Sequence, residues 1–129
     1  MVREYGKVVG ATVLLIGVVG LVLGQRSLFG VLNIDIAEDV IHLVTGGLLV
    51  YVGFGKRDSS VARAVVGGIG VVYLLVGAYS FADPNPFGLF PSEYSVLDNL
   101  IHLTLGILAI AVAWVLPARQ PSTPRLPGR

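Results

Sequence analysis

The sequence predicts an all-α membrane protein: a four-transmembrane-helix bundle built from two tandem helical-hairpin repeats in parallel orientation. Three observations predict this fold class, namely the apolar composition, four apolar stretches of spanning length, and an internal repeat. Of the 129 residues, 54% are hydrophobic and 13% are charged. The mean hydropathy of +0.82 is far too high for a soluble domain of this length. The chain is therefore expected to lie in a lipid bilayer.

Four stretches with few or no charges divide the chain, namely residues 5–23, 36–54, 61–81 and 96–116. Each has about the twenty residues that a helix needs to cross a hydrocarbon core. Strands of an outer-membrane barrel would alternate apolar and polar residues, and these stretches do not. Because backbone hydrogen bonds must be satisfied within each span, we interpret all four as helices.

The internal repeat has an offset of sixty positions. Residues 35–48 (DIAEDVIHLVTGGL) return as residues 95–108 (SVLDNLIHLTLGIL), and the only two histidines, His42 and His102, occupy equivalent places. Other matches at this offset are Arg3 with Arg63, Gly10 with Gly70, and Gly17 with Gly77. Because a hairpin returns to its starting side, two copies of a hairpin have the same orientation in the membrane.

This repeat predicts the domain organisation. We expect a first transmembrane hairpin over residues 1–58 and a second over residues 59–116. Residues 117–129, rich in proline and arginine, are expected to form a disordered cytoplasmic tail. The outer connections at residues 28–32 and 87–90 are apolar enough to dip into the membrane interface.

The net charge is only +1, but the charged residues are unevenly distributed along the chain. This asymmetry predicts the membrane topology. Lysines and arginines gather at the N-terminus, between the second and third spans, and in the tail, whereas acids gather in the other two connections with Arg26 as their sole cation. An excess of Lys and Arg marks the cytoplasmic side, so the N- and C-termini are expected to be cytoplasmic. The basic groups are scattered along a membrane rim, which argues against nucleic acid as a partner.

Two further features restrict the chemistry and the processing of the chain. The absence of cysteine excludes disulfides, thiolate metal sites and iron–sulfur clusters. The first span resembles a signal peptide in its charged start, but no small-residue cleavage pattern follows it and it aligns with the third span. We therefore expect it to be retained.

Glycines recur along one face of each predicted helix, namely Gly10, Gly17, Gly46, Gly70, Gly77 and Gly106. Small residues let helix backbones approach closely in lipid, where the hydrophobic effect does not drive association. We interpret these glycines as helix-packing residues. Packing within one chain and packing between copies are both open at this point.

Two capping patterns set the starts of the second and fourth helices. Asp35 stands three positions before Glu38, and Ser95 stands three before Asp98, as in a capping box. These helices are therefore expected to begin near Asp35 and Ser95. Both histidines then lie about 10 Å below the caps, in the outer leaflet of the membrane.

Ionisable or amide side chains within the spans form a candidate site of Asp39, His42, Asn99 and His102, because such groups usually face the bundle interior. Three interpretations stay open. In the first, the histidines form interhelical hydrogen bonds and only fix the helix register. In the second, His42, His102 and Asp39 bind a divalent metal such as zinc or a translocated ion.

The third interpretation is a haem b, with the two histidines as axial ligands. Gly46 and Gly106, four residues beyond the histidines, would then make room for the macrocycle. No catalytic residues are predicted, since the serines lie in no nucleophile motif and residues 67–70 (GGIG) lie inside a span without the lysine of a phosphate loop. We therefore expect a protein other than an enzyme.

A family resemblance rests on residues 29–33 (FGVLN) and 39–46 (DVIHLVTG) in a small four-span chain. With this motif, residues 3–116 resemble the bacterial membrane proteins classed as domain of unknown function 4383. The resemblance implies a four-helix membrane protein in which the histidine-centred segment matters, and it implies no activity or cofactor. A weaker resemblance to DoxX-like membrane proteins implies a redox-linked role.

The sequence as a whole favours a structural or accessory subunit with no cofactor. Its small size and its glycine-lined helices predict a homo-oligomer, or association with a larger membrane-protein complex. The alternative function is a membrane binding protein that uses the His/Asp cluster for a divalent metal, haem b or a translocated ion.

Overall fold

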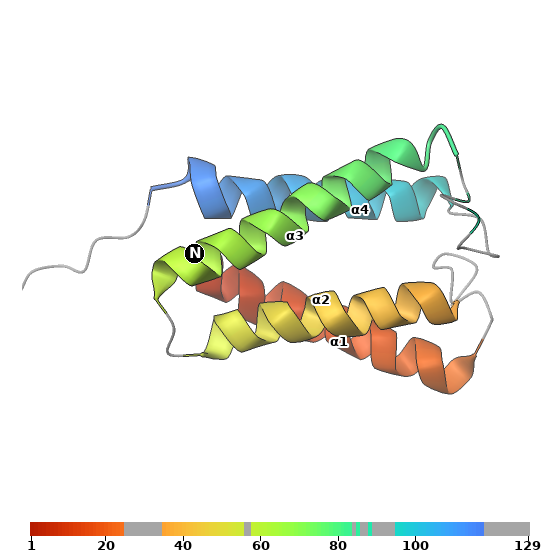
Figure 1. The fold of residues 1–129 in the computed structure, drawn as a ribbon, viewed down its shortest axis with the longest axis horizontal. Helices are drawn as coiled ribbons and strands as arrows, with labels where there is room; N and C mark the ends of the chain where they lie inside the picture. The colour runs from red at the N-terminus through yellow and green to blue at the C-terminus, as the bar shows by residue number, and fades with distance from the viewer. Residues whose placement is uncertain (25–34, 56–57, 84, 86–87, 89–94, 118–129) are drawn as a thin grey trace, which may run out of the picture.

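The structure is a computed structural model that describes residues 1–24, 35–55, 58–83, 85, 88 and 95–117. It contains four long helices and a π-helical turn (Figure 1), namely α1 (Val2–Leu23), α2 (Ile36–Phe54), α3 (Ser59–Tyr79), α4 (Val96–Ile110) and η2 (Ala111–Val115). Residues 28–32, residues 118–129 of the tail, and all but Gly88 of residues 87–90 lie outside the described residues.

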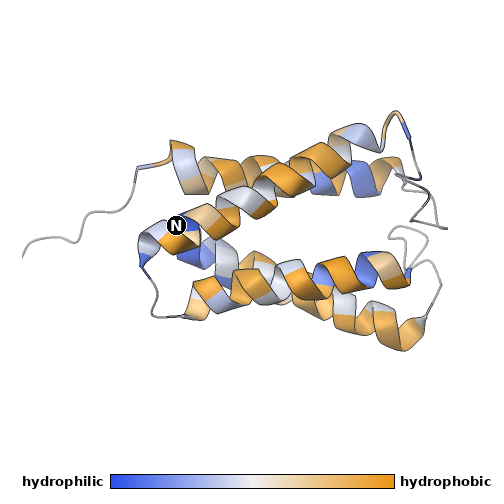
Figure 2. Ribbon diagram, viewed as in Figure 1, coloured by the Kyte–Doolittle hydropathy of each residue, from blue (hydrophilic) through white to orange (hydrophobic). Residues whose placement is uncertain are grey.

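All four helices are long and apolar enough to cross a membrane, with η2 completing the fourth span. Apolar residues run along each helix, while hydrophilic residues gather near the starts of the helices (Figure 2). The described part of the chain is therefore all-helical and has four candidate membrane spans, as the composition predicts.

The helices pair as two hairpins, α1 with α2 and α3 with α4 (Figure 1). Contacts within each hairpin are far more extensive than contacts between the hairpins. Both α1 and α3 begin at one end of the molecule, and both α2 and α4 begin at the other end. The starts of α2 and α4 are therefore brought together, and they carry the polar residues of the candidate site.

Glycines allow α1 and α2 to approach closely. A methyl group built on Gly10 would lie 2.7 Å from Leu49 Cβ, and one on Gly17 would lie 2.9 Å from the backbone oxygen of Asp39. A methyl group on Gly46 would lie 2.5 Å from a backbone nitrogen of α1. Larger residues at these positions would push the helices apart, since lipid offers little drive to keep them together.

The second hairpin packs in the same manner. A methyl group on Gly70 would lie 2.7 Å from Ala109 Cβ, and one on Gly77 would lie 2.9 Å from the backbone oxygen of Asn99. Gly106 lies equally close to the backbone of α3. All six glycines that the sequence analysis singles out thus contact a helix of the same chain.

Side-chain caps begin three of the helices. The Asp35 side chain accepts a hydrogen bond from Glu38 N at 2.8 Å, and Ser95 Oγ accepts one from Asp98 N at 3.1 Å. α2 and α4 therefore start where the capping patterns predict. Asp58 caps α3 through Ser60 N, and this backbone hydrogen bond lowers the pKa of the Asp58 carboxyl. With this cap, α3 begins at Ser59, two residues before the apolar stretch 61–81 that the sequence predicts.

The last span ends in a way that the apolar pattern does not predict. Ala111 N donates to the carbonyls of both Ile107 and Leu108, and Leu116 N donates to Ala111 O at 2.8 Å. This hydrogen bond spans five residues instead of four, so the last turn is a π-helical turn, η2. The π turn includes Trp114, whose indole ring covers Gly67 of α3.

A small core joins the two hairpins, and its buried members are Leu49, Val52, Ala62, Val66, Ile69, Tyr73, Ala109 and Ala113. Two hydrogen bonds also cross between the hairpins. Tyr5 Oη donates to Leu105 O at 2.7 Å, and the hydroxyls of Thr45 and Tyr73 lie 2.8 Å apart. The polar residues of the site lie beside this core, at the end where α2 and α4 begin.

Candidate metal site

Three ligand-type side chains from two helices converge between the hairpins. One carboxylate oxygen of Glu38 and one ring nitrogen each from His42 and His102 all lie within 4.8 Å of one another. The imidazole rings have centroids 6.3 Å apart and planes 12° from parallel. The structure thus brings together the two histidines that the sequence analysis singles out.

A small cavity lies against this group. It has a volume of about 40 Å³, and its polar lining residues are Glu38, His42, Tyr73, Asp98 and His102. Such a volume is close to that of one water molecule. The cavity is therefore suited to a single ion or water molecule.

The hydrogen bond of His102 determines which ring nitrogen carries the hydrogen. His102 Nδ1 lies 2.8 Å from the backbone oxygen of Asp98. Since a carbonyl can only accept, Nδ1 carries the hydrogen and the neutral ring keeps its lone pair on Nε2. A backbone carbonyl that holds the other nitrogen in this way is the common arrangement of metal-binding histidines.

Two polar atoms of the group lack a hydrogen-bond partner among the described residues. They are Glu38 Oε2 and His42 Nδ1, and both atoms are buried. The Glu38 residue is only 3% exposed. Because buried polar atoms in folded proteins are nearly always paired, a bound species at these atoms would satisfy a need that the chain leaves unmet.

Tyr73 is a site residue that the sequence analysis did not identify. Thr45 Oγ1 donates its only hydrogen to Ile41 O at 2.7 Å, so Tyr73 Oη donates to Thr45 Oγ1. The Tyr73 ring meets the ring of His102 edge to face, with centroids 5.3 Å apart. One signal was present in the sequence, since Tyr73 carries a hydroxyl group between apolar neighbours in the middle of a span.

Asp39 does not belong to the converging group, and Glu38 takes the position expected for it. At about 100° per residue, Glu38 lies about 40° from His42 around the helix, whereas Asp39 lies about 60° away on the other side. That side faces α1, where the Asp39 carboxylate contacts Gly20. Glu38 and His42 of α2 thus lie on the side of the cavity, whereas Asp39 lies against α1.

Asn99 also lies beside the group and outside it. It is 3% exposed, and its Oδ1 atom has no partner among the described residues. The cavity is lined by Asp98 in its place. Ser95 Oγ donates to Asp98 Oδ2 at 2.9 Å, so the cap of α4 also orients this carboxylate.

The end of the molecule that holds the site is rich in buried acids, namely Asp35, Glu38, Asp39 and Asp98, each at most 3% exposed. The lysines and arginines among the described residues belong to the first two turns of α1 and α3, at the opposite end. Buried carboxylates without a nearby cation are costly when ionised. The electrostatics of this end therefore favour a positively charged ligand.

The space that a haem would need is occupied. Gly46 was expected to clear room for the macrocycle, but it packs on the backbone of Leu14, and Gly106 packs on that of Leu74. Gly46 faces α1 and Gly106 faces α3. Each glycine allows the two helices of its hairpin to approach closely. The remaining cavity of about 40 Å³ is far below the several hundred Å³ of an organic-ligand pocket.

The apolar helices and the fold define a small four-helix membrane protein, here with an ion-sized polar site between its hairpins. Residues 1–55 match the family model described as Domain of unknown function (DUF4383). This stretch, which contains α1 and α2, is therefore a DUF4383 domain, and the predicted family is confirmed over it. No curated protein and no solved structure matches the chain, and the resemblance to DoxX-like proteins receives no support.

Proposed function

We propose that this membrane protein binds one divalent transition-metal ion between its two hairpins. The observation that carries the proposal is the convergence of Glu38, His42 and His102, with ligand atoms within 4.8 Å of one another beside an ion-sized cavity. Tetrahedral zinc has ligand atoms about 3.4 Å apart. Side-chain movements of an ångström or so would therefore close the group around an ion.

The donor set favours zinc and chemically similar metals. Two imidazole nitrogens with one carboxylate oxygen suit zinc, whereas calcium and magnesium prefer oxygen ligands alone. Three protein ligands leave the fourth position of a tetrahedral ion open. Asp98 and a water molecule are the two candidates for that position, since Asp98 also lines the cavity.

A purely structural role for the histidines has less support. An interhelical hydrogen-bond cluster would satisfy its own donors and acceptors. Here Glu38 Oε2 and His42 Nδ1 are buried without a partner among the described residues. A bound cation would pair directly with Glu38 Oε2. It would also be coordinated by one ring nitrogen of His42.

The test uses two neighbouring acids of α2 as a matched pair. Purified protein in nanodiscs is loaded with zinc, washed and analysed for zinc content, as wild type, Glu38→Gln and Asp39→Asn. We expect about one zinc per chain in the wild type and in Asp39→Asn, and a loss of at least tenfold in zinc affinity for Glu38→Gln. Equal zinc content in all three proteins, or none in the wild type, would overturn the proposal.

We also propose that the end with Arg3, Lys7 and Arg63 lies on the cytoplasmic side and that the metal site lies in the outer leaflet. The excess of basic residues at that end supports this orientation. The chain has no cysteine, so single cysteines can report it. A membrane-impermeant maleimide should label Ala82→Cys in intact cells and Ser59→Cys only after permeabilisation, and the opposite pattern would contradict the orientation.

A further inference from the structure

A second pocket lies at the opposite end of the molecule from the metal site. It has a volume of about 310 Å³ and is lined by the starts of α1 and α3 together with η2 and Pro117. Charged residues in its lining are Arg3, Glu4 and Arg63. Because the helices that end here are long enough to span a membrane, this pocket lies at the level of the lipid headgroups.

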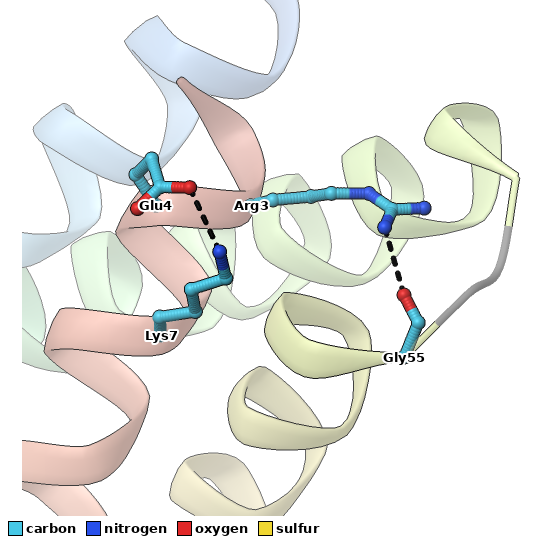
Figure 3. A network of polar contacts seen from close by, with 4 residues as sticks. All are labelled: Arg3, Glu4, Lys7 and Gly55. Atoms are coloured by element: carbon cyan, nitrogen blue, oxygen red, sulfur yellow. Dashed lines mark hydrogen bonds and ion pairs between the residues drawn. The ribbon is translucent and has the colours of Figure 1, made fainter.

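The charges of this pocket favour an anion. Arg3 and Arg63 come from different hairpins and stand at equivalent positions of the sequence, sixty residues apart. Glu4 is paired with Lys7, whose Nζ atom lies 2.9 Å from Glu4 Oε1 (Figure 3). Since this ion pair neutralises the acid locally, the two arginines leave the pocket with a net positive charge.

Local structure holds one of these arginines in place. Arg3 Nη1 donates to the backbone oxygen of Gly55 at 2.8 Å, which ties the start of α1 to the end of α2 (Figure 3). The positive ends of the α1 and α3 dipoles add to the field of the arginines, because both helices begin here. The α1 start has no side-chain cap.

The rest of the lining is apolar and includes Val2, Val112 and Pro117. A pocket lined by two arginine residues beside apolar side chains matches a ligand with an anionic headgroup joined to hydrocarbon. We propose that this pocket binds the phosphate of an anionic phospholipid headgroup. Guanidinium groups pair well with phosphate oxygens, and basic pockets between spanning helices are known lipid sites.

The experiment measures lipid binding by native mass spectrometry of the full chain in detergent. The protein is titrated with phosphatidylglycerol and, separately, with phosphatidylcholine of the same acyl chains. We expect the wild type to prefer phosphatidylglycerol, and Arg63→Gln to lose about fivefold of that preference, the effect of one basic residue near a membrane surface. An unchanged preference in Arg63→Gln would overturn the proposal.

A second variant covers the case in which Arg63→Gln fails to fold. Ser59→Glu adds a negative charge to the pocket at the exposed first residue of α3, where an acidic side chain favours the helix. Its matched control is Ala82→Glu, which makes the same charge change at an exposed position beyond the end of α3. We expect only Ser59→Glu to lose the preference for phosphatidylglycerol, and equal losses in both variants would overturn the proposal.

Inorganic phosphate separates the lipid from a free anion. Millimolar phosphate is added to the complex with phosphatidylglycerol, and the bound lipid is counted again. We expect the lipid to remain bound, since the apolar part of the pocket contacts its acyl chains. Displacement of the lipid by free phosphate would assign the pocket to a soluble anion and would overturn the lipid assignment.

Discussion

The first hairpin, α1 with α2, and the second, α3 with α4, are held together at corresponding positions. Gly10 packs on Leu49 and Gly70 packs on Ala109, and both members of the second pair lie sixty positions after those of the first. Gly17 and Gly77 likewise contact equivalent backbone atoms of α2 and α4. Corresponding residues of the two hairpins thus make corresponding contacts, and the duplication of one hairpin stays a prediction.

At the candidate metal site the same two hairpins differ. Glu38 leaves Oε2 unpaired at the cavity, while the equivalent Asp98 has a shorter side chain that accepts from Ser95 Oγ. His102 has its Nδ1 held by a backbone oxygen, whereas His42 Nδ1 has no partner among the described residues. In the proposed site, the second hairpin would supply a ligand that is already held in place, and the first would supply ligands that a bound ion would fix.

The hydrogen bond between Tyr73 and Thr45 likewise has no counterpart at the equivalent positions. Tyr73 donates to Thr45 across the interface, while the equivalent positions hold Val13 and Leu105. Two copies of one hairpin would supply a symmetric scaffold, and a few substitutions in it would produce an asymmetric ligand set. Similar packing in two halves is therefore a poor guide to which half carries the chemistry.

The largest expected effect concerns the two histidines. His42→Ala and His102→Ala should each weaken zinc binding by more than about 100-fold, beyond the range for loss of an outer-shell partner. Competition with a chelating dye measures these affinities. Wild-type affinity in His102→Ala would remove the one ligand of the second hairpin and contradict a site between the hairpins, and wild-type affinity in His42→Ala would remove His42 from the ligand set.

Packing substitutions test whether the hairpins are equivalent in stability. Gly46→Ala and Gly106→Ala should each lower the free energy of unfolding by about 1–3 kcal/mol, because the added methyl group meets helix backbone. Gly47→Ala is the matched control, since nothing lies within 4 Å of its added methyl group. Thermal unfolding in detergent measures the three changes. A loss in the control equal to that of Gly46→Ala would refute the packing role.

Loss of the Tyr73 hydroxyl should have a smaller effect. Tyr73→Phe removes the hydrogen bond to Thr45 that orients the ring against His102, and we expect zinc affinity to fall by about tenfold. Tyr79→Phe on the same helix is exposed and should leave zinc affinity unchanged. Identical affinities in both variants would remove Tyr73 from the site.

Self-association is expected to be the weakest effect. The glycines that predicted it are used within each hairpin, so contacts between copies through the described helices would involve their lipid-facing surfaces instead. The homo-oligomer stays a prediction, and native mass spectrometry from mild detergent tests it. A monodisperse monomer with no bound protein partner would contradict both self-association and the role as an accessory subunit.

Much of the fold follows from one-dimensional signals in the sequence. The spans follow from hydropathy, and the starts of α2 and α4 follow from Asp35 and Ser95. The π turn at Ala111–Val115 could not be predicted, because its hydrogen bonds depend on how the end of α4 packs on α3. Steric fit of Trp114 over Gly67 is a tertiary property with no local pattern.

The candidate site could be predicted in part. Two histidines in an apolar chain identify the region, but helical spacing alone allows both Glu38 and Asp39 as the third ligand. Their separation depends on where α1 lies, since Asp39 contacts Gly20 of that helix. Tyr73 lies 29 residues before His102 in sequence, and only the packing of α3 brings it to the site.

The central claim is that the two hairpins hold one metal ion with ligands from both. X-ray absorption at the zinc edge of zinc-loaded protein tests this claim most directly. The account predicts two imidazole nitrogens and a carboxylate oxygen at about 2.0–2.2 Å, with imidazole scattering halved in His42→Ala. A spectrum without imidazole scattering, with zinc surrounded by water and carboxylates alone, would contradict it.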